Sequence, residues 1–242
     1  SDYRNIMPEF GTMEQFDKLL DEMHKRDLKL VMDLVVNHSS DEHKWFERSK
    51  ESKDNEYSEY YIWRDPKVGI NGEKMPPNNW VSFFSGSAWE YCDKRDQYYL
   101  HLFSKKQPDL NWENEVVRKE VYDIMKFWLD KGIDGFRMDV INLISKVQGL
   151  PDGQGHDGLI GAENFFNGPR FHEFMDEMNK EVLSKYDCMT VGETPGADPV
   201  EALRTVGADR KELNMLFQFE HMGIGSQPQG KWWPKEWTLH DL

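Results

Sequence analysis

The chain of 242 residues is poor in cysteine, in net positive charge and in long apolar stretches. Its two cysteines, Cys92 and Cys188, are too few for a disulfide framework, so two free thiols in a reducing compartment are favoured over a bridge. No apolar run reaches the length of about 20 residues that a membrane-spanning helix needs, and no signal peptide is visible. We therefore expect a cytoplasmic protein without a membrane anchor.

Basic residues are outnumbered, because 30 Lys and Arg stand against 44 Asp and Glu and give a formal charge of -14. Nucleic acids and anionic membranes bind basic surfaces, so both are disfavoured as partners. The composition fits an enzyme that acts on a neutral ligand. Aromatic residues make up 13% of the chain and include nine Trp, which favours a carbohydrate, since aromatic faces stack on sugar rings.

Helical and strand patterns alternate at the start of the chain. Thr12 and Gln15 match a capping box ahead of apolar residues at helical spacing, which predicts a helix over residues 12–26. A nearly continuous apolar run predicts a buried parallel strand over residues 28–36. Residues 38–106 lose this regularity, and so long an irregular stretch indicates a functional region or a small inserted domain.

Regular patterns return after residue 106 and favour an α/β fold with a parallel sheet. Val117, Val121, Ile124 and Trp128 form one helical face, and Gly132 stands where the residue after a helix end belongs. The other predicted elements are a strand over 133–139, a helix that begins at Pro169, and strands over 189–192 and 215–219.

Two of these predicted strands end on a carboxylate, Asp139 and Glu193. Ligands meet parallel strands at their carboxyl ends, so the two side chains are expected near one site. An Asp and a Glu are the pair that glycoside hydrolysis requires, one as nucleophile and one as general acid and base. Strand-end carboxylates also form structural salt bridges, so the pair alone is a weak signal.

Four motifs make the signal specific: Asp-Leu-Val-Val-Asn-His at 33–38, Gln-Pro-Asp-Leu-Asn at 107–111, Gly-Phe-Arg-Met-Asp-Val-Ile-Asn at 135–142 and Gly-Glu-Thr-Pro at 192–195. With these motifs the chain resembles the α-amylase superfamily of glycoside hydrolases (family 13). Within that superfamily it is most similar to the oligo-1,6-glucosidase and dextran glucosidase group. The resemblance covers essentially the whole chain.

The resemblance implies an α/β fold, a partial (β/α)8 TIM barrel with about strands three to six and a small domain inserted after the third strand. Residues 1–38 and 107–242 would form the barrel, and residues 39–106 the inserted domain. The first two strands would precede Ser1. The last two strands, a carboxy-terminal β domain and a third catalytic carboxylate would follow Leu242, so residues 1–242 alone are expected to be inactive. His240-Asp241 follows a Trp-rich loop and is not expected to supply that carboxylate.

The resemblance also implies roles for individual residues. Asp139 would be the nucleophile and Glu193 the acid and base. Arg137 lies two residues before Asp139, hence on the same face of the strand, and would keep that carboxylate ionised, whereas Glu193 needs a raised pKa to begin protonated. A buried Arg-Asp pair that only braces the barrel is the alternative reading, and Asp33 is expected to pair with Arg137 or with a backbone amide.

Three further residues follow the strands directly. The resemblance makes His38 a contact to the glucose at the non-reducing subsite, although a hydrogen-bonded strand-end histidine is the commoner case. Val140 goes with a preference for α-1,6 linkages in the family, with simple strand packing as its alternative. Asn142 would shape the acceptor side.

Some motif residues carry weaker expectations. Asn37 binds calcium in amylases of the superfamily, but a turn-stabilising Asn fits equally well here, and we expect no metal or cofactor. Residues 107–111 are expected to close the inserted domain onto the barrel rather than to contact substrate. Lys105 and Lys106 are expected to be solvated rather than to bind a phosphate.

The sequence therefore predicts a retaining α-glucosidase that hydrolyses α-1,6 bonds of isomalto-oligosaccharides through a covalent glucosyl-Asp intermediate. A small oligosaccharide would be its only partner, and the full-length enzyme would be a monomer. The alternatives of the same superfamily are trehalose-6-phosphate hydrolase and a sucrose isomerase or glucosyltransferase. A non-catalytic relative, such as the amylase-like heavy subunits of amino-acid transporters, is disfavoured because both carboxylates are present and no membrane span is seen.

Overall fold

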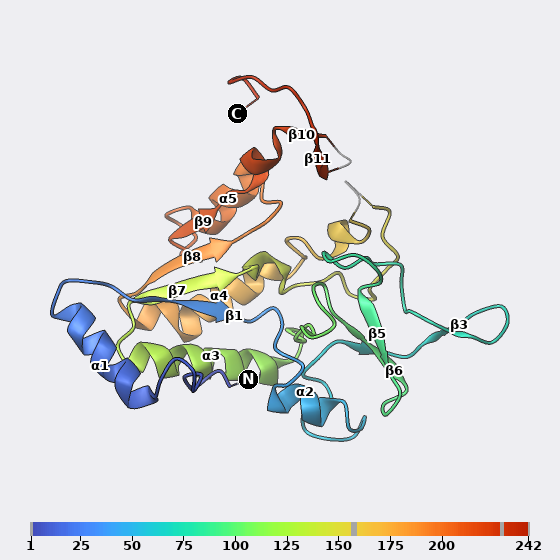
Figure 1. Ribbon diagram of the computed structural model, residues 1–242, viewed down its shortest axis with the longest axis horizontal. Helices are drawn as coiled ribbons and strands as arrows, with labels where there is room; N and C mark the ends of the chain where they lie inside the picture. The colour runs from blue at the N-terminus through green and yellow to red at the C-terminus, as the bar shows by residue number, and fades with distance from the viewer. Residues whose placement is uncertain (1, 156–158, 228–229, 242) are drawn as a thin grey trace.

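The computed structural model describes residues 2–155, 159–227 and 230–241. Its centre is a four-stranded parallel sheet in the order β1-β7-β8-β9 (Figure 1). The strands are β1 (Val31–Val35), β7 (Gly135–Asp139), β8 (Met189–Glu193) and β9 (Met215–Phe217). The parallel sheet that the alternating pattern predicted is thus confirmed.

Helix α1 (Met13–His24) precedes β1, and three helices connect the successive strands of this sheet: α3 (Glu115–Asp130), α4 (Phe171–Glu181) and α5 (Pro199–Val206). The predicted capping box of α1 is present, since Thr12 accepts from the Gln15 amide and the Gln15 side chain accepts from the Thr12 amide. Gly132 follows the C-cap of α3 with φ 101°, a left-handed conformation that glycine adopts without strain. The predicted start of α1 and the predicted end of α3 are therefore confirmed.

The main core lies between the sheet and the helices α3 and α4. Alternate residues of β7 face this core, and the residues between them face the other side of the sheet. Phe136 and Met138 are 1% and 0% exposed and pack against apolar residues of both helices. Arg137 and Asp139 alternate with them and so point to the opposite face of the sheet. The residues that α3 and α4 contribute to this core are Val117, Val121, Ile124, Met125, Trp128, Phe171, Phe174, Met175 and Met178.

The predicted boundaries differ from the structure in several places. The strand predicted over 28–36 is shorter, and Leu34 is its single buried residue, because β1 pairs with β7 along one edge only within the described part of the chain. The helix predicted from Pro169 begins at Phe171, and the strand predicted over 215–219 ends at Phe217. Helix α5 was not predicted, although Asp198 caps it and Pro199 follows at the first helical position.

Residues 39–106 form a separate layer beside the parallel sheet (Figure 1). It contains α2 (Lys44–Ser49) and an antiparallel sheet in the order β2-β6-β5, made of β2 (Trp63–Arg64), β6 (Gln97–Leu100) and β5 (Trp89–Cys92). A short hairpin joins β3 (Lys67–Val68) to β4 (Lys74–Met75). The irregularity of the sequence here reflects short strands and long connections.

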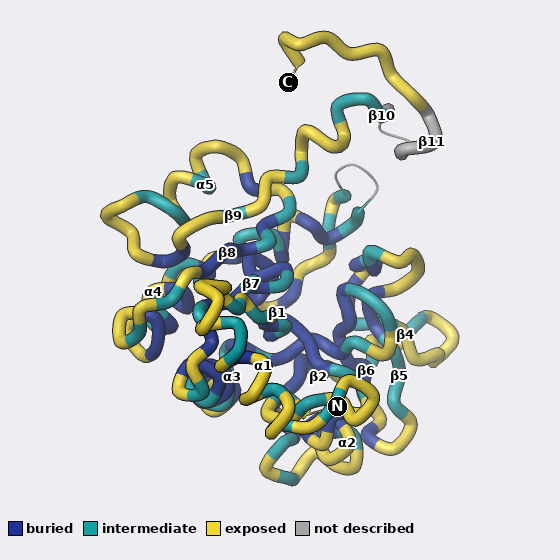
Figure 2. The backbone as a smooth tube through the Cα atoms, turned by 60° about the vertical axis from the view of Figure 1, so that its left-hand side comes forward, coloured by how far each residue is buried: buried dark blue, intermediate teal, exposed yellow. Residues whose placement is uncertain are grey.

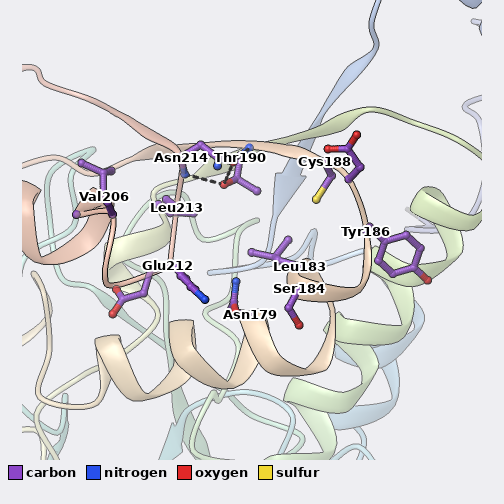
Figure 3. A pocket seen from close by; sticks show the side chains of 14 residues that line it. Asn179, Leu183, Ser184, Tyr186, Cys188, Thr190, Val206, Glu212, Leu213 and Asn214 are labelled. Atoms are coloured by element: carbon purple, nitrogen blue, oxygen red, sulfur yellow. Dashed lines mark hydrogen bonds between the residues drawn. The ribbon is translucent and has the colours of Figure 1, made fainter.

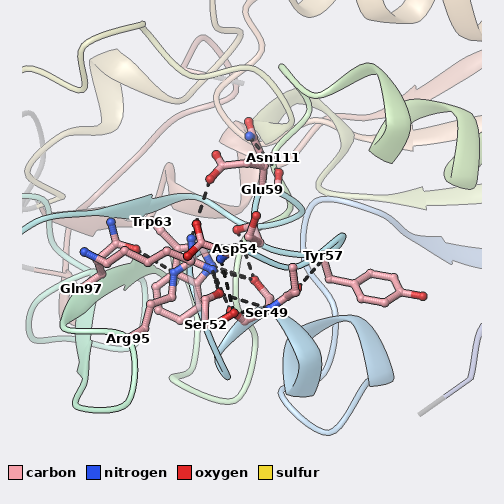
Figure 4. Close-up of polar contacts among 12 residues, drawn as sticks. Ser49, Ser52, Asp54, Tyr57, Glu59, Trp63, Arg95, Gln97 and Asn111 are labelled. Carbon is pink, nitrogen blue, oxygen red and sulfur yellow. Dashed lines mark hydrogen bonds and ion pairs between the residues drawn. The ribbon is translucent and has the colours of Figure 1, made fainter.

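Arg95 holds the irregular part of this layer together (Figure 4). It is 3% exposed, and its guanidinium lies 4.4 Å from the centre of the Trp63 ring. It donates to the carbonyl oxygens of Ser49 at 2.7 Å and Ser52 at 3.2 Å and to the Gln97 side chain at 2.6 Å. One buried side chain thus satisfies backbone groups that no strand partner reaches.

The remaining elements are short. They are the 3-10 helices η1 (Ile141–Leu143), η2 (Ala162–Asn164), η3 (Leu183–Lys185) and η4 (Glu220–Gly223) and the antiparallel pair β10 (Ser226–Gln227) and β11 (Gly230–Pro234). The chain after β9 is largely exposed where its burial is described, and its last residues run away from the body (Figure 2). His240 and Asp241 are exposed within it.

The structure also describes the two cysteines and the apolar character of the helices. Cys92 and Cys188 are free and half-buried, which confirms the prediction of two thiols. None of the helices within the described ranges combines the length and apolar character that crossing a membrane requires.

Candidate active site

The two strand-end carboxylates meet on the face of the sheet that points away from α3 and α4. Met138 pairs with Gly192 in the register of β7 and β8, so Asp139 and Glu193 are the next residues on neighbouring strands. Asp33 of β1 lies opposite Arg137 of β7. The register alone therefore brings three carboxylates around one arginine.

Arg137 binds all three of these carboxylates. Its Nη1 donates to Asp33 Oδ1 at 2.9 Å and to Asp139 Oδ1 at 2.6 Å, and its Nη2 donates to Glu193 Oε2. Of the two partners expected for Asp33, Arg137 and a backbone amide, the structure shows Arg137, and the predicted shared face of Arg137 and Asp139 is confirmed. The catalytic roles of Asp139 and Glu193 stay predictions, but the geometry brings the two residues together.

The charges of this cluster affect one another. Burial raises the pKa of Glu193, and the negative charge of Asp139 and a hydrogen bond with it add to that rise, which outweighs the lowering effect of Arg137. Burial disfavours the charge of Arg137, but its hydrogen bonds to Asp33 and Asp139 outweigh this and raise its pKa. The result is a permanent cation beside a carboxyl group that retains its proton to higher pH.

Val140 directly follows Asp139 in the chain, and its backbone N–H contacts Glu193. Its N–H points to Glu193 Oε2 at 3.4 Å, and its φ of 36° is in the left-handed region. The side chain is 6% exposed and belongs to a second apolar cluster with Leu143, Leu150 and Phe165. The expected packing role of Val140 is thus present, whereas its part in linkage preference stays a prediction.

His38 lies beside Asp139, as a residue that follows β1. Its Nε2 is 4.0 Å from Asp139 Oδ2 and 3.1 Å from the Gln107 side-chain nitrogen, and its ring packs against Phe103 with centroids 5.1 Å apart. Burial lowers the pKa of His38, although the charges of Asp109 and Asp139 oppose the shift. A neutral imidazole next to the carboxylate pair is able to exchange hydrogen bonds with a sugar hydroxyl.

Behind His38 lies a buried ion pair. Lys146 Nζ contacts Asp109 Oδ2 at 2.8 Å and Asn37 Oδ1 at 2.9 Å, and these three residues are 3%, 0% and 0% exposed. Asn37 also donates to Asp109 at 3.2 Å and lies 3.3 Å from His38 Nδ1. The Asn37 oxygen, the candidate calcium ligand, thus binds the Lys146 ammonium instead.

Two expectations about neighbouring loops fit this arrangement. Asp109 also accepts from the Leu102 amide at 2.9 Å, so the 107–111 motif does join residues 39–106 to the parallel sheet. Lys105 pairs with Glu90 at 2.7 Å, and Lys106 pairs with Asp41 at 3.0 Å. Both lysines are thus engaged with surface carboxylates.

Within the described ranges no group of three or more His, Cys, Asp or Glu side chains has metal-binding geometry.

Sequence reasoning missed three residues of this site. Tyr3 is half-buried and donates to the His38 carbonyl at 3.0 Å, Phe103 stacks on Phe83 beside His38, and Lys146 is the buried cation. Only Lys146 left a signal, as one charge in the apolar run 140–147. Asn142, expected on the acceptor side, is 0% exposed and bonds to Pro195 and Asn167.

A cavity of about 540 Å³ lies at the opposite end of β8 from Glu193 (Figure 3). Thr190 and Asn214 lie side by side above it, and Asn179 of α4 lies below. The Thr190 hydroxyl and the Asn214 side chain already bond to each other. The cavity is therefore no part of the carboxylate site.

Comparisons with known proteins place this geometry in a family. Residues 1–242 match the α-amylase catalytic domain. The oligo-1,6-glucosidase of Parageobacillus thermoglucosidasius is 64% identical over 245 aligned residues, which cover 100% of this chain and 43% of that protein. The crystal structure of Bacillus licheniformis trehalose-6-phosphate hydrolase has a TM-score of 0.92 and 49% identity and covers 100% of this chain and 42% of that chain.

A third comparison is the structure of an isomaltulose synthase variant from Erwinia rhapontici bound to D-glucose, with a TM-score of 0.91 and 46% identity over 99% of this chain and 42% of that one. The chain thus belongs to the α-amylase family and has its α/β fold of the TIM-barrel type. It spans less than half the length of the relatives that it matches.

Proposed function

We propose that the protein is a retaining α-glucosidase that hydrolyses α-1,6 bonds of isomalto-oligosaccharides. The observation that carries this proposal is the binding of Asp139 and Glu193 to the two terminal nitrogens of one guanidinium, that of Arg137. Retaining glycosidases need their two carboxyl groups close together, about 5–5.5 Å apart, and a shared guanidinium holds them at short range. The similarity to an oligo-1,6-glucosidase supports the linkage.

The reaction would take place in two displacements. Asp139 attacks the anomeric carbon while the bond to the leaving oxygen breaks, and Glu193 gives its proton to that oxygen. Glu193 then takes a proton from water, whose oxygen attacks the same carbon and breaks the glucosyl-Asp bond. Two inversions leave the α configuration unchanged and restore both carboxyl groups.

The environment of each carboxyl group suits its role. The raised pKa of Glu193 keeps the acid protonated at the start of the cycle, and Arg137 stabilises the ionised Asp139. Glucose would contact Arg137 and His38 in the first subsite, with Val140 limiting the space on the acceptor side. The oligosaccharide would be the only partner of a monomeric enzyme.

We further propose that the parallel sheet corresponds to barrel strands three to six. Residues 1–38 and 107–242 would contribute the barrel, and residues 39–106 a small domain inserted after the third strand. The order β1-β7-β8-β9 and the separate antiparallel layer of β2, β5 and β6 support this division.

Trehalose 6-phosphate and sucrose are the rival substrates, because the matched solved structures include a hydrolase and a synthase that are named for them or for their products. A phosphate needs free cations near the acceptor side. Lys105 and Lys106, which directly precede the 107–111 motif in the sequence, are each paired with a carboxylate. The higher identity to the oligo-1,6-glucosidase also favours isomaltose.

The test is a substrate panel with the full-length protein: isomaltose, maltose, trehalose 6-phosphate and sucrose. We expect isomaltose to have the highest kcat/KM, with α-glucose as the first product by NMR. Asp139→Asn and Glu193→Gln should each lower kcat/KM for isomaltose by at least about a thousandfold. Release of β-glucose, or full activity of Asp139→Asn, would overturn the proposal.

A further inference from the structure

The segment that follows Asp139 has an unusual backbone. Val140 adopts φ 36° and ψ 43° and leads directly into η1. A β-branched residue in the left-handed region is a genuine outlier, and such strain concentrates where the surrounding structure holds a functional geometry. The backbone of Val140 is therefore in a conformation that valine disfavours, and the contacts of the turn must stabilise it.

The turn contacts the strand immediately before Glu193. Ile141 lies so close to β8 that a Cβ atom on Gly192 would be 3.1 Å from Ile141 Cγ2. On the other side it would be 2.5 Å from Leu213 Cδ1. Glycine at 192 thus permits η1 to lie directly against the backbone that carries Glu193.

The turn also contacts Glu193 itself and the loop after it. The Val140 N–H points to Glu193 Oε2 at 3.4 Å. Asn142 donates through Nδ2 to the Pro195 carbonyl at 2.8 Å and to the Asn167 side chain at 3.0 Å. Asn142 is 0% exposed, and its own carbonyl accepts from the Asn167 amide at 3.0 Å.

We propose that residues 140–142 form a bracket that sets the position of Glu193 relative to Asp139, with Asn142 as a positioning residue. The bracket contacts the strand before Glu193, the carboxylate and the loop after it, and it begins at the residue after Asp139. This inference rests on the proposed function. Asn142 is 0% exposed, and its Nδ2 bonds to Pro195 and Asn167, so it acts on the reaction through the position of Glu193.

The bracket predicts a specific kinetic signature. An acid that is displaced from the leaving oxygen slows substrates whose leaving group needs a proton, and it spares those whose leaving group departs as a stable anion. Isomaltose is of the first kind and 2,4-dinitrophenyl α-glucoside of the second. Since kcat/KM reports the first displacement, it isolates the acid role of Glu193 from its later role as base.

The experiment compares these two substrates in the full-length protein. Asn142→Ala should lower kcat/KM for isomaltose by about 10- to 100-fold and for the dinitrophenyl glucoside by less than about threefold. Asn167→Gly removes the second acceptor of Asn142 while glycine tolerates the φ of 46° at that position, and it should show the same bias more weakly. This second variant keeps the test valid if Asn142→Ala folds poorly.

Asn78→Ala is the matched control, because Asn78 is 6% exposed and bonds to Leu150, Trp80 and Trp89, away from Glu193. It should change both substrates by the same factor. Equal losses on both substrates in Asn142→Ala and Asn167→Gly would overturn the bracket and make Asn142 a purely structural residue.

A wild-type protein without activity on either substrate would overturn the proposed function and not the bracket. The bracket is then tested by the crystal structure of Asn142→Ala. A Glu193 carboxylate displaced from its wild-type position relative to Asp139 supports the bracket, and an unchanged position overturns it.

Discussion

The parallel sheet and residues 39–106 are ordered by different means. In the sheet, strands pair in regular register and two helices cover one face with a continuous apolar core. In residues 39–106, short strands are held by packed aromatic rings and by buried polar side chains such as Arg95 and Asn78. Repetition makes the first region recognisable from sequence, whereas single long-range contacts define the second.

Both the sheet and the connection that follows residues 39–106 contribute to the candidate site. The sheet contributes Asp139, Glu193 and Arg137 from the ends of its strands. The connection after residues 39–106 contributes Gln107 and Asp109, which act on His38 and Asn37. Asp109 joins the two regions, because it accepts from the Leu102 amide and contacts Lys146 and Asn37, so variants at this junction and on either side of it test the difference between the regions.

The largest stability effect is expected at the junction. Lys146→Met leaves the carboxylate of Asp109, which is 0% exposed, without its ion partner. Breaking a buried pair in this way costs about 3–5 kcal/mol of the free energy of unfolding, measurable by urea denaturation. Lys131→Met, which breaks a more exposed pair with Asp17, should cost less than about 1 kcal/mol.

The double variant Lys146→Met with Asp109→Asn removes the unpaired charge and should recover part of that loss. If Lys146→Met alone cost no more than Lys131→Met, the buried pair with Asp109 would not stabilise the junction between the two regions.

The next effect concerns the sheet. Arg137→Lys keeps a positive charge but has no planar fork to bind Asp33, Asp139 and Glu193 together. We expect kcat/KM for isomaltose to fall by about 10²–10³-fold, as for loss of a preorganised electrostatic contact. Arg170→Lys is the control, since Arg170 pairs with Glu113 and Glu173 outside the site. Similar losses in both variants would indicate general damage.

A smaller effect is expected where the two apolar clusters approach the site. Val140→Ala enlarges the space after Asp139 and should shift the ratio of kcat/KM toward maltose relative to isomaltose. Removing methyl groups from a pocket changes discrimination by about 1–3 kcal/mol. An unchanged ratio would mean that Val140 only packs against Leu143 and Phe165.

The smallest effect lies within residues 39–106. Burial lowers the pKa of His43 from 6.5 to about 4, and its Nδ1 accepts from the Trp45 amide at the start of α2. Between these pH values the unfolded chain binds a proton that the folded chain does not. The stability from neutral His43 is thus present above pH 6.5 and declines as pH falls toward 4.

Thermal melts from pH 7 to pH 4 measure this dependence. His43→Asn retains a helix cap without a titratable group, so its melting temperature should fall less over this range than that of the wild type. His240→Asn, at an exposed position, should melt with the wild-type profile. Parallel profiles for His43→Asn and the wild type would contradict the assigned role of His43.

Prediction from sequence was most accurate where local rules apply. The Thr12 capping box and the helix end at Gly132 were both predicted correctly. For Asp33 the sequence left Arg137 and a backbone amide as possible partners, and the structure shows Arg137. Helix α5 was missed although Asp198 and Pro199 signalled it. The burial of the first predicted strand was overestimated, because a strand's neighbours along its edges cannot be read from its own composition.

The sequence by itself determined the strands of the parallel sheet, the strand ends that carry Asp139 and Glu193 and the family motifs, because these depend on residues within a few positions of one another. Only the tertiary structure decided that Lys146 meets Asn37, 109 residues away, and that Asn142 binds the loop after Glu193. Such contacts follow from how strands and connections pack in space. Burial then determines which charges are paired and which pKa values shift, and these properties exist only in the folded chain.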